Sequence, residues 1–325
     1  MKNNYALTDL HLHLDGSLSL ASVKELAALQ NIEIPNNDEE LLGKLQVSEG
    51  CRDLNEYLEK FDFPCSLMQT STGITAAVKN LEAELAAQGL IYAEIRFAPQ
   101  LHTLQGMTQS EVVAAAVKGM GQSALRSTLI LCCMRGKENH EANLETVRVA
   151  KDFLGNGVGA IDLAGAEALF PTADFADMFV LAKELGVPYT IHAGEADGPE
   201  SIYKALEFGA KRIGHGVRSL EDGTLVQRLA AEGITLEMCP TSNLNTSIFD
   251  SYEAYPLRKL MEAGIKVTVN TDNMTVSNTT AAAELEHLKL TKEEMHLLAK
   301  NAVEAAFADA ETKAWLKEEV EKRFL

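Results

Sequence analysis

Short apolar runs alternate along the chain with longer segments in which apolar residues recur every three or four positions. The longer segments are rich in Ala, Leu, Glu and Lys, which favour helix. Several of the short runs are almost continuously apolar, as in parallel strands that are buried on both faces. The runs predict eight strands, at Leu7–Leu14, Leu90–Ala98, Thr128–Met134, Gly157–Leu163, Pro188–His192, Arg212–Gly216, Ile234–Met238 and Ile265–Asn270. The clearest helical segments between them are Glu111–Ala124, Asp174–Leu185, Glu200–Phe208 and Gly223–Glu232. Eight strands that alternate with helices predict an α/β fold, a (β/α)8 TIM barrel.

The segment between the first two predicted strands is about 75 residues long, more than one crossover connection needs. It contains three predicted helices, Ser17–Gln30, Asn37–Leu45 and Asp53–Gln69, so we expect residues 17–75 to form a helical insertion. In a barrel this insertion lies above the carboxyl ends of the strands, where it can act as a lid. Residues 280–325 are predicted to form a helical C-terminal extension, and residues 1–325 a single domain.

A doubly wound open sheet is the structural alternative. Its nucleotide-binding fingerprint is missing, because the nearest string, Gly155-Asn-Gly-Val-Gly159, lacks the G-x-G-x-x-G spacing and precedes a predicted strand. The sequence also lacks a Walker lysine motif. The barrel is therefore the preferred interpretation.

The charge and the cysteines of the chain restrict its partners and its location. With 29 Lys and Arg against 47 Asp and Glu, the net charge is −18, which repels phosphate backbones and anionic headgroups. We therefore expect no nucleic-acid polymer and no membrane surface as a partner. Five cysteines without disulfide-like spacing, and a first segment without the apolar core of a signal peptide, predict a cytoplasmic protein. No oligomeric state is predicted.

Two histidines lie two positions apart in the first predicted strand. Because residues i and i+2 of a strand face the same side, His11 and His13 point together into the barrel near the carboxyl end of the strand. The fifth strand places His192 at the same end of the barrel, and Glu195 follows it. Imidazoles held side by side can bind a metal such as Zn²⁺. Packed core histidines and a polar loop are the alternative interpretation.

Two further strand ends carry polar residues of the same kind. His215 lies between glycines at the end of the sixth strand, and Asp272 follows the eighth. Core packing explains one such residue but not their shared position, so we predict a metal site. Three histidines and a carboxylate suit Zn²⁺, which makes water acidic enough to supply hydroxide near neutral pH. There Glu195 can shuttle protons and His215 can orient or deprotonate the water, which predicts metal-assisted hydrolysis. The remaining histidines are interpreted as ordinary surface or helix residues: His102, His140, His287 and His296.

Several short strings occur in a fixed order along the chain. They are His11-Leu-His-Leu-Asp-Gly16, Tyr92-Ala-Glu-Ile-Arg96, Leu131-Cys-Cys-Met-Arg135, Ile161-Asp-Leu-Ala-Gly165, His192-Ala-Gly-Glu195, Gly214-His-Gly216, Glu237-Met-Cys-Pro-Thr-Ser-Asn243, Thr271-Asp272 and Asn301-Ala302. In order and spacing these strings resemble the adenosine deaminase family, within the metal-dependent amidohydrolases. The resemblance extends from about Leu7 to about Phe307.

The resemblance implies hydrolytic deamination of adenosine, and of 2′-deoxyadenosine, to the inosine product and ammonia in purine salvage. It implies one Zn²⁺ per chain, with His11, His13, His192 and Asp272 as ligands. Glu195 would protonate N1 of the purine, and His215 and Asp272 would manage the water that attacks C6.

The resemblance also implies how a small purine nucleoside is bound. The backbone of Gly165 would meet purine N3, and Asp15 would bind the ribose 5′-hydroxyl. Asn273 would touch purine N7. Leu58 and Phe61, in the predicted insertion, would form part of an apolar lid.

Two positions depart from the family pattern, and they leave related activities open. Asn273 stands where the family usually has a second aspartate, and Ala166, followed by Glu167, stands where an acidic residue is usual. The alternatives are an adenine deaminase, which typically carries glutamate at the position of Asp15, and a deaminase of a modified adenine nucleoside. A non-catalytic binding protein on the same barrel is a further alternative, but such a protein would be expected to have lost metal ligands. A binuclear amidohydrolase is disfavoured, since the fourth strand end, Asp162-Leu-Ala-Gly165, lacks the bridging lysine.

Overall fold

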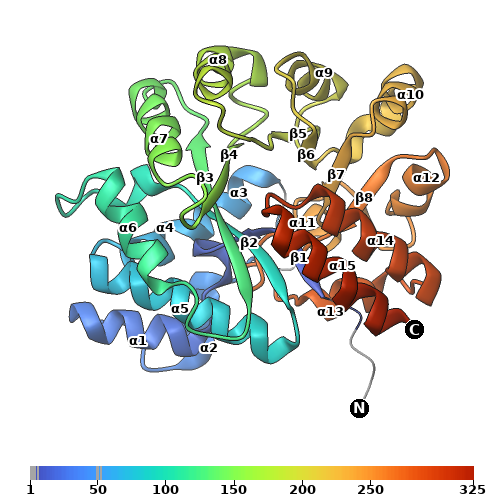
Figure 1. Cartoon of the computed structure of the whole chain (residues 1–325). Coiled ribbons are helices and arrows are strands. Elements are labelled where there is room, and N and C mark those ends of the chain that lie inside the picture. The colour runs from blue at the N-terminus through green and yellow to red at the C-terminus, as the bar shows by residue number, and fades with distance from the viewer. Residues whose placement is uncertain (1–4, 6, 49–50, 52) are drawn as a thin grey trace.

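A computed structural model describes residue 5 and residues 7–48, 51 and 53–325 of the chain. Expectations for the first four residues and residue 6, and for residues 49, 50 and 52 of the insertion, lie outside the described residues. The described part contains eight parallel strands: β1 (Thr8–His13), β2 (Tyr92–Phe97), β3 (Arg126–Met134), β4 (Val158–Ala164), β5 (His192–Ala193), β6 (Arg212–His215), β7 (Thr235–Met238) and β8 (Lys266–Val269). Helices alternate with these strands and surround them (Figure 1). The predicted α/β (β/α)8 barrel is confirmed.

Single bridges complete the strand pairing of the barrel. Regular pairing joins β1 to β4 in one group and β5 to β8 in another. Leu12 bridges to Asp272 on one side, and Ile161 bridges to Tyr189 on the other. The first pairing holds the carboxyl end of β1 directly against the residues that follow β8.

The fifth strand is shorter than the sequence predicts. We expected a strand over Pro188–His192, but regular pairing with β6 begins at His192. Pro188 has no N–H to donate to a ladder, and the segment meets β4 through the carbonyl of Pro188 and the bridge at Tyr189.

The crossover helices between β2 and β8 are α6 (Gln109–Gly119), α7 (His140–Asp152), α8 (Ala176–Leu185), α9 (Pro199–Glu207), α10 (Gly223–Ala231), α11 (Pro240–Asn245) and α12 (Leu257–Glu262). Four of these crossover helices, α6, α8, α9 and α10, lie where the apolar periodicity predicts them. The predicted helix Glu111–Ala124 ends earlier, at Gly119, and Gly121 then adopts a positive φ of 71°. Glycine adopts this left-handed conformation at little cost, so a turn forms before β3.

The helical insertion and the helical extension are both present in the described residues. Between β1 and β2 lie α1 (Leu20–Gln30), α2 (Asp38–Leu45), α3 (Leu54–Leu58), α4 (Asp62–Ser66) and α5 (Ser71–Gln88). The chain ends in α13 (Ala281–His287), α14 (Lys292–Ala305) and α15 (Ala310–Phe324). The predicted helix Asp53–Gln69 is two short helices joined by a 3₁₀ turn, since Pro64 cannot donate the hydrogen bond that a continuous helix requires.

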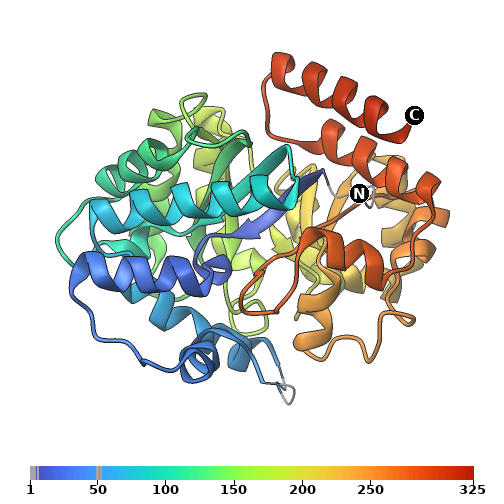
Figure 2. The same ribbon diagram turned by 90° about the horizontal axis from the view of Figure 1, so that it is seen from below.

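The insertion and the extension lie at opposite ends of the strands. Apolar residues of α14 and α15 pack on Leu7, Leu10 and Tyr92, at the amino ends of β1 and β2. Tyr57 of α3 packs instead with Val276, which follows β8. Figure 2 shows the blue inserted segment and the red C-terminal helices on opposite sides. Among the described residues, no helix has the length and the apolar character needed to cross a membrane.

A network of buried charges runs through the interior of the barrel. Arg96 of β2 contacts Asp162 of β4 and Glu237 of β7, each at 2.8 Å. Arg212 of β6 contacts Glu94 at 2.6 Å and the second oxygen of Glu237 at 2.7 Å. None of these side chains is more than 3% exposed. Each ion therefore depends on its partners, because water cannot replace them.

The first prediction concerns this network. We expect Arg96→Ala to lower the free energy of unfolding by about 3–5 kcal/mol, since it leaves Asp162 buried without an arginine and Glu237 with Arg212 alone. Urea unfolding of both proteins in the same metal state measures the change. Lys204→Ala, which removes an exposed ion pair with Glu207, is the control and should cost no more than about 1 kcal/mol. Equal stability of Arg96→Ala and the parent protein would contradict the prediction.

Candidate metal centre and active site

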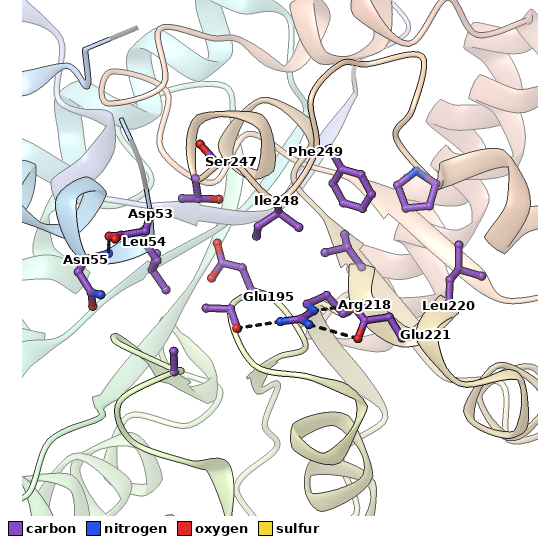
Figure 3. Close-up of a pocket in the computed structure, with 15 residues that line it drawn as sticks. Asp53, Leu54, Asn55, Glu195, Arg218, Leu220, Glu221, Ser247, Ile248 and Phe249 are labelled. Atoms are coloured by element: carbon purple, nitrogen blue, oxygen red, sulfur yellow. Dashed lines mark hydrogen bonds and ion pairs between the residues drawn. The ribbon is translucent and has the colours of Figure 1, made fainter. Parts of the chain in front are cut away.

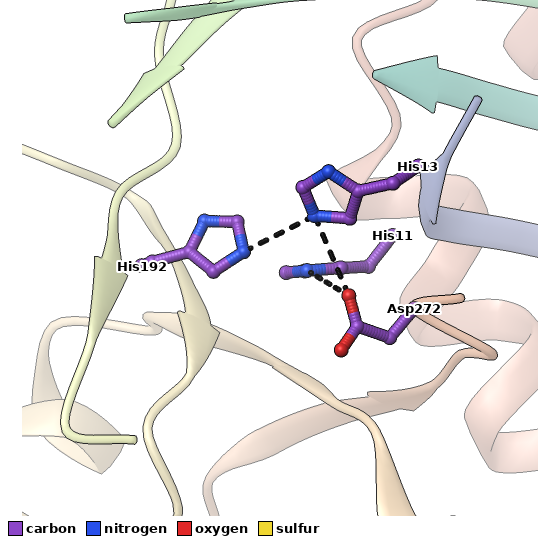
Figure 4. Close-up of side chains that lie close together, drawn as sticks. All are labelled: His11, His13, His192 and Asp272. Carbon is purple, nitrogen blue, oxygen red and sulfur yellow. Dashed lines mark hydrogen bonds and ion pairs between the residues drawn. The ribbon is translucent and has the colours of Figure 1, made fainter. Parts of the chain in front are cut away.

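Three histidines and one aspartate meet at the carboxyl ends of the strands (Figure 4). His11 and His13 come from β1, His192 begins β5, and Asp272 follows β8. Oδ1 of Asp272 lies 3.4 Å from Nε2 of His11 and 3.4 Å from Nε2 of His13. Nε2 of His13 lies 3.4 Å from Nε2 of His192. The strand ends thus hold four metal-ligating atoms within one small volume.

The spacing and the chemistry of these atoms fit one Zn²⁺. Ligand atoms about 2.0–2.1 Å from a tetrahedral zinc ion lie about 3.3–3.4 Å from one another. Nε2 of His11 is buried and has no hydrogen-bond partner among the described residues. Burial lowers the pKa of His13 well below its usual value, so its ring is neutral and has a lone pair to donate. A metal ion would satisfy donor atoms that the protein leaves without partners.

Buried carboxylates orient two of the ligand histidines. Oε2 of Glu237 lies 2.8 Å from Nδ1 of His11, and Oδ2 of Asp162 lies 2.8 Å from Nδ1 of His192. Burial opposes the charge of both carboxylates, but nearby cations outweigh it and keep their pKa values low. The contact of His11 is a hydrogen bond and that of His192 a close ion-pair contact, and in both rings Nδ1 faces the carboxylate, which leaves Nε2 to face the cluster. The sequence analysis missed both carboxylates, although each stands out as a charge within an otherwise apolar strand.

A cavity of about 300 Å³ opens beside the four ligating atoms. Its walls include ten of the residues singled out in the sequence: His13, Asp15, Leu58, Phe61, Gly165, His192, Glu195, His215, Asp272 and Asn273. His11 lies beneath it and is fully buried. Leu54, Tyr57 and Leu58 come from the insertion, whereas Gly165 follows β4. The structure thus brings all the predicted site residues together around one cavity.

Glu195 and His215 face each other across this cavity. Oε2 of Glu195 lies 3.6 Å from Nε2 of His215, too far for a hydrogen bond. Burial, and then the negative charges of Asp272 and Glu167, raise the pKa of Glu195 well above its usual value. Glu195 is therefore suited to hold a proton near neutral pH.

Glu167 holds the loop that carries Glu195. One of its carboxylate oxygens accepts from the backbone N–H of Gly194 at 2.7 Å. The other accepts from the N–H groups of Glu195, Ala196 and Asp197, at 3.0, 2.8 and 3.1 Å. Hydrogen bonds to a carboxylate are the stronger kind, so four of them fix this turn. The sequence analysis noted Glu167 only as a displaced acidic residue. The neighbouring Ala166 lines the cavity.

Asp15 and Asn273 lie on the side of the cavity that faces the start of the insertion. Burial raises the pKa of Asp15 to about 6. Its Oδ2 accepts from Sγ of Cys65 at 3.6 Å, while its buried Oδ1 has no partner among the described residues. The Asn273 side chain packs on Gly16, where a Cβ atom would meet Oδ1 of Asn273 at 1.9 Å. A larger residue at Gly16 would displace Asn273.

A second cavity, of about 580 Å³, lies on the other side of Glu195 (Figure 3). The two cavities share Leu54 and Glu195. Arg218 borders the second cavity, but its guanidinium already contacts Glu221 at 2.7 Å and the carbonyl of Ala196 at 3.0 Å. The described groups of possible metal ligands all include His11, His215 or Asp272, at the smaller cavity. The candidate metal ligands therefore lie at the smaller of the two cavities.

One of the four remaining histidines differs from its interpretation as an ordinary surface or helix residue. His102 ends the 3₁₀ helix η3 (Pro99–His102) and is fully buried beside the ring of Phe97. Burial lowers its pKa to about 4, so it is a neutral packed side chain. Of the two interpretations, surface or helix, His102 fits the second, but it is buried, because a polar string after a strand does not reveal whether its segment folds inward. His140 is exposed, His287 stacks on Tyr252 in the turn before α12, and His296 stacks on Phe324 of α15.

Comparison with known proteins gives consistent results. The sequence model of the adenosine deaminase family matches residues 6–323. The adenosine deaminase of Haemophilus ducreyi is 48% identical over 334 residues, which cover 98% of this chain and 97% of that protein. The adenine deaminase of Arthrobacter aurescens superposes with a TM-score of 0.87 at 29% identity and covers 98% of both chains. An Arabidopsis N6-mAMP deaminase superposes with a TM-score of 0.86 at 26% identity, over 99% of this chain and 100% of that one.

The second prediction concerns the loop held by Glu167. In Glu167→Gln, an amide group with a single acceptor oxygen faces four backbone donors. Hydrogen bonds to a charged group contribute about 1.5–3 kcal/mol, so the backbone amides of residues 194–197 should exchange with solvent at least about tenfold faster. Hydrogen–deuterium exchange measures this rate. Glu200→Gln, an exposed carboxylate at the start of α9, is the matched control. Unchanged exchange in Glu167→Gln would show that other contacts hold the loop.

Proposed function

The chain belongs to the adenosine deaminase family, and from this membership we propose that it hydrolyses adenosine and 2′-deoxyadenosine. The products are inosine or 2′-deoxyinosine and ammonia, as in purine salvage. The observation that carries the proposal is the meeting of a zinc-type ligand set, a proton-holding Glu195 and His215 at one cavity. A purine nucleoside is a small-molecule substrate, which agrees with the net charge of −18. Cys65, Cys132, Cys133 and Cys239 are free thiols, which favours a cytoplasmic location.

We assign the metal site to one Zn²⁺ per chain. Nε2 of His11, His13 and His192 and Oδ1 of Asp272 would hold it, on the spacing described above. When bound there, zinc supplies the Lewis acidity that makes a water molecule nucleophilic near neutral pH. The glutamate and aspartate partners of His11 and His192 would keep the ligand rings in place.

The residues of the chain then move the protons. Glu195 donates a proton to N1 of the purine, which makes C6 electrophilic. The C6–O bond forms as the attacking water loses a proton to Asp272, and this proton passes to the amino group. The C6–N bond breaks and ammonia leaves, while the new hydroxyl returns its proton to Glu195 as the C6 carbonyl forms. His215 contacts the attacking oxygen. General acid–base catalysis of this kind accelerates a reaction by about 10²–10⁴-fold.

Three positions would select the purine nucleoside. The backbone N–H of Gly165 would donate to N3, and Nδ2 of Asn273 would donate to N7, which is an acceptor only. An aspartate could donate to N7 only when protonated, so Asn273 preserves the hydrogen bond at every pH. The unpaired Oδ1 of Asp15 would accept from the ribose 5′-hydroxyl.

The same cavity disfavours a 5′-phosphate. Arg135 is the only Lys or Arg among the described residues that line it. Its terminal nitrogens already donate to the carbonyls of Phe170 and His192 and to Thr172. A phosphate beside Asp15 would therefore meet like charge without a free cation, which favours the nucleoside over the nucleotide.

We further propose that residues 17–75 form a lid within a single barrel domain. Leu58 and Phe61 line the cavity beside Leu54 and Tyr57. These side chains cover the site with apolar surface. Excluding water strengthens each electrostatic interaction of Glu195 with the substrate.

The third prediction tests the activity itself. We expect ammonia release from adenosine and 2′-deoxyadenosine, with much lower kcat/KM for AMP, 5′-deoxyadenosine, adenine and cytidine. Removing a hydrogen bond to the charged Asp15 should cost 5′-deoxyadenosine about 1.5–3 kcal/mol, or roughly 10- to 150-fold in kcat/KM. Equal or better turnover of adenine would assign an adenine deaminase instead. Better turnover of N6-methyladenosine than of adenosine would assign a modified nucleoside as the substrate. No turnover of any adenine compound by the zinc-loaded protein would favour the non-catalytic alternative.

The fourth prediction tests the metal ligands. We expect His11→Ala and His192→Ala to reduce both bound zinc and turnover, because each removes one of four ligands. Glu195→Gln is the matched control in the same cavity and should lose at least about 10²-fold in turnover while it keeps its zinc. Elemental analysis of the purified proteins gives the metal content. One stoichiometric zinc ion in a His11→Ala, His13→Ala double variant would contradict the assignment.

A further inference from the structure

Arg135 and Glu167 are buried residues of opposite charge, and both form hydrogen bonds to the backbone of residues 192–197. Arg135 is 5% exposed and Glu167 is 1% exposed. Within the described residues, the guanidinium donates only to two backbone carbonyls and a hydroxyl, and the carboxylate accepts only from backbone N–H groups and a hydroxyl. Neither group therefore has the direct ionic partner that a buried charge usually needs.

Two buried hydroxyl groups connect these charges. Nη2 of Arg135 donates to Oγ1 of Thr172 at 2.9 Å. Oγ1 of Thr172 lies 2.8 Å from Oγ of Ser201, which is on α9. The Ser201 hydroxyl donates to the same carboxylate oxygen of Glu167 that accepts from Gly194. One continuous hydrogen-bonded chain, the relay, thus consists of Arg135, Thr172, Ser201 and Glu167.

The two ends of the relay fix the direction of every hydrogen bond in it. A guanidinium has no acceptor, so the Thr172 hydroxyl accepts from Arg135. A carboxylate has no donor, so Ser201 uses its only hydrogen for Glu167 and has to accept from Thr172. Each hydroxyl therefore accepts on the side of the cation and donates towards the anion. Hydroxyl dipoles that are aligned in this way polarise one another, so they connect two charges that do not touch.

The two ends of the relay also hold the same backbone segment. Arg135, which follows β3, donates to the carbonyl of His192 at 2.7 Å. Glu167, which follows β4, accepts from the N–H groups of residues 194–197. His192 is a candidate zinc ligand, and Glu195 is the candidate proton donor. The relay therefore braces the segment that sets the position of one relative to the other.

We propose that the relay is a positioning unit, an ion pair connected through two hydroxyls, which holds Glu195 in the orientation that delivers its proton to the substrate. This goes beyond the direct contact of Glu167 with the loop. Thr172 forms no hydrogen bond to residues 192–197 among the described contacts, yet a change at Thr172 should alter this segment. The effect on turnover rests on the proposed deamination, whereas the coupling within the relay does not.

Hydrogen–deuterium exchange of the zinc-loaded protein tests this coupling without a substrate. Thr172→Val removes the hydroxyl at nearly constant volume. It should accelerate the exchange of the backbone N–H groups of residues 194–197 by about 3- to 10-fold, the range of one neutral hydrogen bond. Thr172→Ser keeps the hydroxyl and should restore the parent rate. Thr146→Val is the matched control and should leave these rates unchanged, because Thr146 is a buried threonine of α7 whose hydroxyl donates to Gln109.

A double variant shows whether the effect passes through Ser201. Ser201→Ala interrupts the relay at the next hydroxyl, so Thr172→Val should add less than about twofold to the exchange rate in that background. Multiplication of the two single effects, or unchanged exchange in Thr172→Val, would overturn the proposal. If Thr172→Val does not fold, Ser201→Ala is measured at the other end of the relay. It should accelerate the exchange of the guanidinium hydrogens of Arg135, read by NMR, and unchanged exchange there would contradict the coupling.

Kinetics with adenosine test the effect on Glu195. We expect Thr172→Val to lower kcat by about 3- to 10-fold at similar KM and full zinc content, because a displaced Glu195 still allows binding but protonates the purine more slowly. Thr172→Ser should restore kcat. An unchanged kcat, or a loss that follows the zinc content, would overturn the positioning role. If exchange shows the coupling but the parent protein deaminates no adenine compound, the proposed function fails and the relay stands.

Discussion

The contact between the Arg96 guanidinium and two buried carboxylates is the interaction on which the rest of the site depends. Arg96 meets Glu237 and Asp162 at 2.8 Å each, and these carboxylates hold Nδ1 of His11 and of His192, also at 2.8 Å. A carboxylate buried without a cation would neutralise itself by taking up a proton. It would then orient the imidazole poorly. The charge of Arg96 thus acts through Asp162 and Glu237 on two candidate metal-ligating histidines.

The barrel supplies the second constraint, which is the position of Asp272. The bridge between Leu12 and Asp272 joins the end of β8 to β1, so the backbone that closes the barrel also carries a candidate ligand. Asp272 adopts a positive φ of 60°, and His215 one of 59°. Non-glycine residues rarely adopt this conformation, which costs of order 1–3 kcal/mol. The surrounding hydrogen bonds hold it, and the strain lies where two polar side chains are turned into the cavity.

The sequence predicts the barrel, and it predicts the candidate site residues at the strand ends, for a physical reason. Parallel strands buried on both faces produce apolar runs, and polar residues at the ends of such runs stand out. His11, His192 and Asp272 could therefore be identified from position alone. Glu167 could not, because its role depends on four backbone N–H groups about thirty residues away that only the folded loop presents together. The burial of His102 could not be predicted either: this residue follows a strand, but its segment folds inward and buries the side chain. The late start of the fifth strand has a local signal in the sequence, Pro188, whereas the packing of the insertion has none.

The histidines of the site differ in the group that lies against Nδ1 of the ring. In His11 and His192 a carboxylate oxygen lies 2.8 Å from Nδ1, so Nε2 is the ring nitrogen that faces the candidate metal site. In His215 the group at Nδ1 is instead the side-chain amide of Asn243, at 3.1 Å. The rings sit close together, with His11 and His215 centroids 4.9 Å apart, so burial and the surrounding charge are nearly shared. The partner at Nδ1 therefore distinguishes the two candidate ligands from His215. Those partners lie on the β4 and β7 strands in one case and on α11 in the other, so the fold rather than the histidine motif assigns the roles.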